Sequence, residues 1–131
     1  MHIELKSDAV AAMTAAAQKE HPCEACGILL GDGNRITAFR QTSNVHPQPE
    51  KHFEIDPQAL IDAHRDARSG GPMVIGYYHS HPTGTPFPSA TDRQMASGDE
   101  SVWVIQGEGG MTVSRNIAED FQSLSYKIVD Q

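Results

Sequence analysis

Apolar residues occur along this chain in short runs, separated by polar segments that contain glycine or proline. Runs rich in β-branched and aromatic residues, or alternating with polar ones, are typical of β-strands. The first run, at the N-terminus, is short and alternating, which favours an edge strand. The last alternates Leu124, Tyr126 and Ile128 with polar residues, which favours a half-buried strand. We expect strands at about residues 1–5, 26–30, 35–40, 52–55, 73–78, 102–105, 111–113 and 124–128.

Two longer helices and one short helix are predicted between these strands. Residues 7–20 are rich in alanine and place Val10, Met13 and Ala17 on one face, with Ser7 as the expected cap and Pro22 beyond the end. Asp56-Pro57 is a start signal for a helix to about residue 69, with Leu60, Ile61 and His64 facing inward. A short helix is expected over residues 89–97, ended by Gly98.

The order of these elements predicts an α/β (α+β) fold in one domain over residues 1–131, large enough to bury an ordinary core. Ten Lys and Arg against seventeen Asp and Glu leave a formal charge of -7, which argues against nucleic acid or an anionic membrane as partner. No apolar run approaches roughly 20 residues, and two cysteines make no disulfide framework. We expect a soluble cytoplasmic protein.

Candidate chemistry is concentrated in residues 78–92, directly after the predicted strand 73–78. His79 and His81 stand two positions apart, so on an extended chain both side chains project to the same side. Asp92 follows after a proline-rich loop. Two imidazoles and a carboxylate, with one position left open, are the ligand set of a catalytic zinc site. A lone histidine at a strand end is more often only hydrogen-bonded, and Ser89 with Asp92 also fits a helix capping box.

The whole pattern resembles the JAMM (MPN-plus) metalloproteases. His79-Ser80-His81-Pro82 followed by Ser89 and Asp92 matches their His-x-His and Ser-x-x-Asp signature. The family's upstream glutamate corresponds to Glu24 in Glu24-Ala25-Cys26-Gly27. The chain is most similar to the short prokaryotic members. The resemblance implies a cytidine-deaminase-like curved mixed sheet, flanked by two longer helices and one short helix.

The resemblance also implies a role for each matched residue. His79, His81 and Asp92 would hold Zn²⁺, Glu24 would serve as the general base, and Ser89 would donate to the oxyanion. The implied substrate is the C-terminal tail of a ubiquitin-like or sulfur-carrier protein. Because the loop 82–88 is short and stiffened by prolines, we expect such a tail to lie extended beside it and to pair with a sheet edge. The stretches 45–52 and 95–100 are short, which argues against linkage-selective deubiquitination.

Other interpretations stay open at this point. The chain could be a zinc amidase or peptidase acting on small molecules or short peptides, or a metal-free scaffold of the same fold. Cys23 and Cys26 form a Cys-x-x-Cys pair, but it lies between a helix end and a strand, and no second pair is present. Cys26 belongs to the family pattern as a packing residue, whereas Cys23 does not. The sequence leaves the oligomeric state and the identity of the substrate undetermined.

Overall fold

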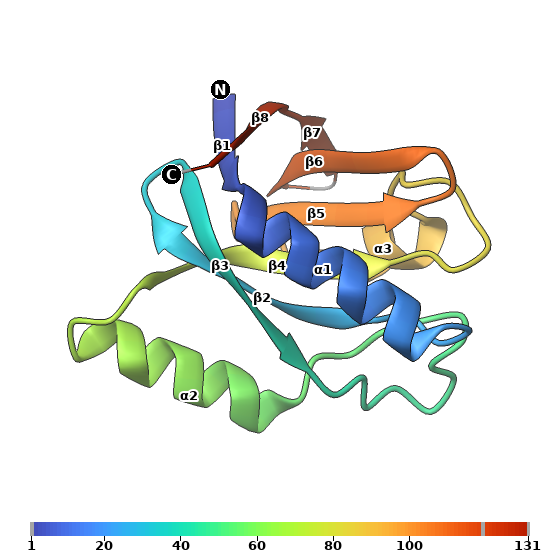
Figure 1. The fold of residues 1–131 in the computed structure, drawn as a ribbon. Coiled ribbons are helices and arrows are strands. Elements are labelled where there is room, and N and C mark those ends of the chain that lie inside the picture. Colours follow the sequence, from blue (N-terminus) through green and yellow to red (C-terminus); the bar gives the residue numbers. More distant parts are fainter. Residues whose placement is uncertain (1, 119, 131) are drawn as a thin grey trace.

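The computed structural model describes residues 2–118 and 120–130, which form one eight-stranded mixed sheet and three helices (Figure 1). The strands lie in the order β7-β6-β5-β4-β2-β3-β1-β8. This arrangement confirms the predicted α+β class. The strands are β1 (His2–Lys6), β2 (Cys26–Asp32), β3 (Arg35–Thr42), β4 (Met73–Ser80), β5 (Val102–Gly107), β6 (Gly110–Ile117), β7 (Asp120–Ser123) and β8 (Ser125–Val129), and the helices are α1 (Ser7–Glu20), α2 (Pro57–Arg68) and α3 (Ala90–Met95).

The centre of the sheet is buried on both faces, and each face has its own apolar cluster. On one face α1 packs against alternate residues of the sheet such as Leu29 and Tyr78. On the other face α2 packs against their chain neighbours Ile28 and Tyr77. Because successive strand residues point to opposite faces, β2 and β4 can serve both clusters only if nearly every position is apolar. The continuous apolar runs of these two strands therefore identify them as central strands.

Helix α1 covers residues 7–20 as predicted, but its phase and its cap differ from the expectation. Ala9, Met13 and Ala16 are the buried residues, whereas Val10 and Ala17 are only partly buried. Ser7 lies inside the helix, and no side chain caps the first turn. Met13 is the largest of the three buried side chains of this helix.

Helix α2 begins as predicted, with Asp56 accepting a hydrogen bond from the Gln58 backbone N–H at 3.0 Å. Its buried stripe passes through Leu60 and Ala63. The expectation that Ile61 and His64 face inward is wrong. Ile61 is 51% exposed, since one residue turns an α-helix by about 100° and carries it away from that stripe. His64 is exposed as well.

Four features of the strands and helices also differ from the sequence prediction. Residues 52–55 form no strand, and only Ile55 makes an isolated bridge, to Asn44. The first strand is not an edge strand, because β1 lies between β3 and β8. The edge is β8, whose Tyr126 and Ile128 are 37% and 47% exposed rather than half-buried against a core. Helix α3 ends at Met95, before the predicted end.

Strand β4 leads into the predicted site from the middle of the sheet. It pairs antiparallel with β2 and parallel with β5. Gly76 makes the second contact possible, because a Cβ there would lie 1.7 Å from the carbonyl oxygen of Val102. The last residues of β4 are therefore fixed on both sides by backbone hydrogen bonds. Within the described part of the chain, no helix is both long and apolar enough to span a bilayer.

Candidate metal centre

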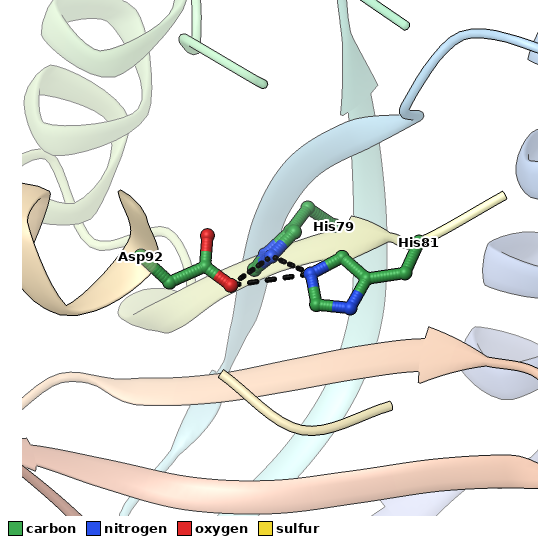
Figure 2. Close-up of side chains that lie close together, drawn as sticks. All are labelled: His79, His81 and Asp92. Carbon is green, nitrogen blue, oxygen red and sulfur yellow. Dashed lines mark hydrogen bonds and ion pairs between the residues drawn. The ribbon is translucent and has the colours of Figure 1, made fainter. Parts of the chain in front are cut away.

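Two histidines and an aspartate meet at the end of β4. His79 is on β4, His81 follows directly after it, and Asp92 comes from α3 on the facing side (Figure 2). The Nε2 atoms of the two histidines lie 3.1 Å apart, and Asp92 Oδ2 lies 3.0 Å from the first and 3.1 Å from the second. The sequence prediction that these three side chains converge is thus met by the geometry.

The spacing of these three atoms fits a metal ion. Nitrogen and oxygen ligands about 2.0–2.1 Å from a tetrahedral zinc are roughly 3.3 Å from one another. The described residues contain this one group of three or more potential ligands with its atoms within 4.8 Å of one another. Lone pairs that face each other at such distances repel unless a proton or a cation lies between them. The three residues can therefore hold a metal ion.

For His79 and Asp92 the environment favours the protonation states that a metal requires. Burial lowers the pKa of His79, which keeps its imidazole neutral. Burial would raise the pKa of Asp92, but hydrogen bonding to the two imidazoles and to the Ser89 backbone N–H outweighs it and holds that pKa well below its usual range. For His81, burial is likewise outweighed, by Asp92 and by a backbone carbonyl, so its pKa is raised. A neutral imidazole and an ionised carboxylate are the forms that bind metals.

The orientation of His81 is set by the loop that follows it. Its Nδ1 lies 2.7 Å from the carbonyl oxygen of Thr85 and donates to it, which leaves the lone pair of Nε2 facing the cluster. The hairpin between β5 and β6 holds this loop in turn. The Glu108 N–H donates to the Gly84 carbonyl at 2.8 Å, and the Thr112 hydroxyl donates to the Pro86 carbonyl.

Aromatic rings fix His79 from its own side of the sheet. The ring of Phe53 stacks on the imidazole with centroids 4.1 Å apart and planes 17° apart. Trp103 meets the same imidazole edge-on at 5.6 Å. The His79 Nδ1 atom is buried and has no hydrogen-bond partner among the described residues. Packing, rather than a second hydrogen bond, therefore holds this ring in place.

The capping box predicted for Ser89 and Asp92 is confirmed, and it is compatible with a place for Asp92 beside the two histidines. Ser89 is the N-cap of α3, and its hydroxyl oxygen accepts from the Asp92 N–H at 3.0 Å. In return, the Ser89 N–H donates to Asp92 Oδ2 at 2.9 Å. That same Oδ2 is the atom that faces the two histidines. The capping box thus orients the carboxylate instead of competing with its place in the cluster.

Glu24 lies just before β2 and borders the cleft beside the cluster. This cleft of about 260 Å³ is also lined by His81 and Ser89. Glu24 is only 6% exposed, and its Oε1 has no hydrogen-bond partner among the described residues. Burial raises its pKa to about 7 from a usual value near 4.5, with a smaller lowering contribution from His81 and a further rise from Asp92. Three of the five residues singled out from the sequence, Glu24, His81 and Ser89, therefore line one cleft, and the other two, His79 and Asp92, contact His81.

The two cysteines differ in their surroundings. Cys26 is fully buried between β3 and β4, as expected of a packing residue, and burial raises the pKa of its thiol to about 11. Cys23 is partly exposed, and both are free thiols. Neither belongs to the metal-ligand cluster found among the described residues.

Several contacts around the site were not foreseen from the sequence. Ser80 lies between the two histidines, and its hydroxyl accepts from the Ala25 N–H at 2.9 Å while its own N–H donates to the Ala25 carbonyl. Asn44 comes from the polar connection before residue 52 and Phe53 from the predicted strand 52–55, and neither belonged to a recognised motif. The isolated Asn and Phe carry no spacing signal, so only their contacts in the folded chain single them out.

Comparison with known proteins agrees with this geometry. The family of prokaryotic homologs of the JAB domain matches residues 6–120. The desampylase of Haloferax volcanii is 36% identical over 115 residues, which cover 86% of this chain and 83% of that protein. The CysO-cysteine peptidase of Mycobacterium tuberculosis is 28% identical over 128 residues, covering 96% of this chain and 82% of that protein.

Solved structures show the same fold. The protein DSY2949 from Desulfitobacterium hafniense superposes with a TM-score of 0.86 at 25% identity and covers all of this chain, with 94% of its own length matched. A structure described as a JAMM metalloprotease-like zinc site superposes with a TM-score of 0.58 at 15% identity, covering 97% of this chain and 99% of that one. The family match over most of the chain, the named peptidase relatives and the shared fold together show that this chain belongs to the prokaryotic JAB branch of the JAMM (MPN-plus) family and is an enzyme of its metallopeptidase class.

Proposed function

We propose that the protein is a zinc-dependent peptidase that hydrolyses an amide bond at the C-terminal tail of a ubiquitin-like or sulfur-carrier protein. The observation that carries this proposal is the convergence of His79, His81 and Asp92 beside a cleft that also presents Glu24 and Ser89. The reaction would either separate a conjugate or release a single amino acid from the carrier. Residues 1–131 would act as one catalytic domain.

The residues that would hold the metal are His79, His81 and Asp92, through Nε2, Nε2 and Oδ2. When bound to such a set, zinc lowers the pKa of its water to about 7 and polarises a carbonyl oxygen. The buried, uncharged imidazole of His79 and the ionised Asp92 need no protonation change to serve as ligands. The two Nε2 atoms and Asp92 Oδ2 lie 3.0–3.1 Å from one another, an arrangement that favours a metal site over a metal-free scaffold.

Glu24 would move the proton. As a general base it accepts a proton from the attacking water, and it then returns that proton to the leaving amine. A base works best when its pKa lies near the operating pH, and burial raises the pKa of Glu24 to about 7. The absence of a fixed partner for Oε1 among the described residues leaves this oxygen free for the task.

Ser89 would stabilise the charge that develops on the carbonyl oxygen. One lone pair of its Oγ accepts from the Asp92 N–H, which fixes the position of the oxygen. The hydroxyl hydrogen remains available for donation to the substrate. The residue also lines the cleft. A donor held in place before the reaction stabilises an oxyanion without reorganising, which is the basis of oxyanion-hole catalysis.

The named relatives support the proposed substrate class. They include two desampylases, CysO-cysteine peptidases and a probable TtuB-protein conjugate cleaving protease from Thermus thermophilus. Strand β4 has strand neighbours on both sides, so it offers no free edge with which the tail could pair beside the cluster. We propose instead that the tail lies across the strand ends, in the cleft bounded by Glu50 and Lys51 on one wall and by Thr83 and Gly84 on the other.

The test compares a carrier-protein conjugate with a short peptide that has the same final residues. If the folded carrier contributes to binding, kcat/KM is at least about tenfold higher for the conjugate, which corresponds to about 1.4 kcal/mol. A mock preparation from cells that carry the empty expression vector serves as the background control for contaminating peptidases. Equal kcat/KM for both substrates would show that the folded carrier does not contribute, and the enzyme would then be an amidase acting on short peptides. Turnover that does not depend on zinc would show that the reaction needs no metal.

A further inference from the structure

Asn44 makes an unusually complete set of hydrogen bonds for a loop residue. Its Nδ2 donates to the carbonyl oxygens of Glu24 at 3.0 Å, His52 at 2.9 Å and Pro49 at 3.4 Å. Its Oδ1 accepts from the backbone N–H groups of His46 and Glu54, both at 3.1 Å. One side chain therefore ties residues 44–54 into a closed loop and joins that loop to Glu24, two residues before β2.

The backbone of Glu24 is held on both sides by this loop. Its N–H donates to the Pro49 carbonyl at 2.7 Å, and its carbonyl accepts from Asn44. The next residue, Ala25, is fixed to β4 by two hydrogen bonds with Ser80. Glu24 is thus clamped between the loop and the strand that carries the histidines.

The side chain of Glu24 has no comparable anchor. Its Oε1 is buried without a hydrogen-bond partner among the described residues. The place of the carboxylate in the cleft therefore depends on where the backbone is held and on the packing around it. Since Asn44 Nδ2 contacts both the Glu24 carbonyl and the carbonyl that receives the Glu24 N–H, it is the side chain common to both halves of the clamp.

We propose that Asn44 is a positioning residue for catalysis, which holds Glu24 at the distance from the metal centre that proton transfer requires. This inference rests on the proposed function of Glu24 as the base. The loop also presents Phe53, whose neighbours His52 and Glu54 are both bound by Asn44 and whose ring stacks on His79. Kinetic comparisons are therefore made at saturating zinc, so that differences in metal occupancy do not enter.

Asn44→Asp is the informative variant. It keeps an oxygen that can accept from His46 and Glu54, but it replaces the donor facing the Glu24, Pro49 and His52 carbonyls with a second acceptor. The control is Asn34→Ala in the turn between β2 and β3, where the side-chain amide similarly donates to a carbonyl of another segment, that of His2, at 2.9 Å. Loss of that bond should affect stability but not turnover.

The kinetic arm is a double-mutant cycle. Asn44→Asp should lower kcat by about ten- to a hundredfold, since displacement of a catalytic group by about 1 Å can cost that much. In a Glu24→Gln background the same substitution should lower kcat by less than about twofold, because the group it positions is already gone. Asn34→Ala should leave kcat within about twofold of wild type in both backgrounds. An equal loss from Asn44→Asp with and without Glu24 would overturn the proposal.

The second arm needs no activity. Amide hydrogen exchange measured by NMR on the metal-free protein should show the Glu24 N–H exchanging at least about tenfold faster in Asn44→Asp, while the Leu29 N–H in the core of β2 is unchanged. Unchanged protection of the Glu24 N–H would overturn the clamp even if kcat fell. If wild type cleaves no substrate, the proposed function fails, and this exchange measurement still decides whether Asn44 holds Glu24.

Discussion

Replacing Gly107 with alanine should weaken metal binding without touching a ligand. Gly107 ends β5, where the loop that orients His81 lies directly against it. A Cβ at this position would lie 2.5 Å from the Gly84 carbonyl oxygen and 2.8 Å from both Pro86 N and the Thr85 carbonyl carbon. All three are backbone atoms, so no side-chain rotation can relieve the overlap, and the loop itself must move.

The size of the effect follows from these distances. Ordinary contact requires about 3.4 Å, so the loop must retreat by roughly 0.6–0.9 Å at an overpacking cost of about 1–3 kcal/mol. The same shift would lengthen the bond between His81 Nδ1 and the Thr85 carbonyl, now 2.7 Å, to about 3.3 Å or more, where a hydrogen bond contributes little. Loss of such an orienting partner typically weakens metal binding by about ten- to a hundredfold.

The assay is competition for zinc against a chelating dye, with thermal unfolding of the metal-free protein measured in parallel. Gly84→Ala is the matched control, because a Cβ there would meet only His81 Cβ, at an ordinary 3.7 Å. The control should bind zinc like wild type. Wild-type zinc affinity in Gly107→Ala would show that the loop does not orient His81 toward a metal, and the reasoning would have to be abandoned.

Three further outcomes test the site from other directions. His79→Ala should lose nearly all bound zinc by elemental analysis, and undiminished metal content would place the ligands elsewhere. Glu24→Gln should retain zinc but lose about two to four orders of magnitude in kcat, whereas a wild-type rate would mean that another group is the base. At pH 8 iodoacetamide should modify Cys23 but not Cys26 in the folded protein, since a thiol with its pKa raised to about 11 stays protonated there; mass spectrometry showing two rapid adducts would contradict this.

The parts of the fold and site that the sequence predicts well are those set by neighbours along the chain. The projection of His79 and His81 to one side follows from strand geometry over two residues, and the cap of α3 depends on residues three apart. The start of α2 was equally local, because Asp56 bonds a backbone N–H two positions away. Each of these features could be inferred without knowing which elements pack together.

The errors arise where the answer depends on distant segments. Whether β1 is an edge strand is decided by β8, more than a hundred residues later, which covers its outer side. Residues 52–55 have strand-like composition, but the hydrogen bonds to Asn44 draw this segment into a loop. Ile61 looked buried because it is apolar, yet the alanine stripe of α2 sets the helix phase. No local pattern carries this information.

Ser89 and Asp92 show why a structural and a functional explanation need not compete. In the capping box the Ser89 N–H holds Asp92 Oδ2, and Oδ2 is also the atom that faces His79 and His81. A carboxylate bonded to a backbone N–H stays ionised and keeps one rotamer, and these are the two properties a metal ligand needs. The hydrogen bond that starts α3 therefore also holds Asp92 toward the two histidines. Substituting Ser89 would disturb both the start of α3 and the orientation of the Asp92 carboxylate, because the same two hydrogen bonds serve both.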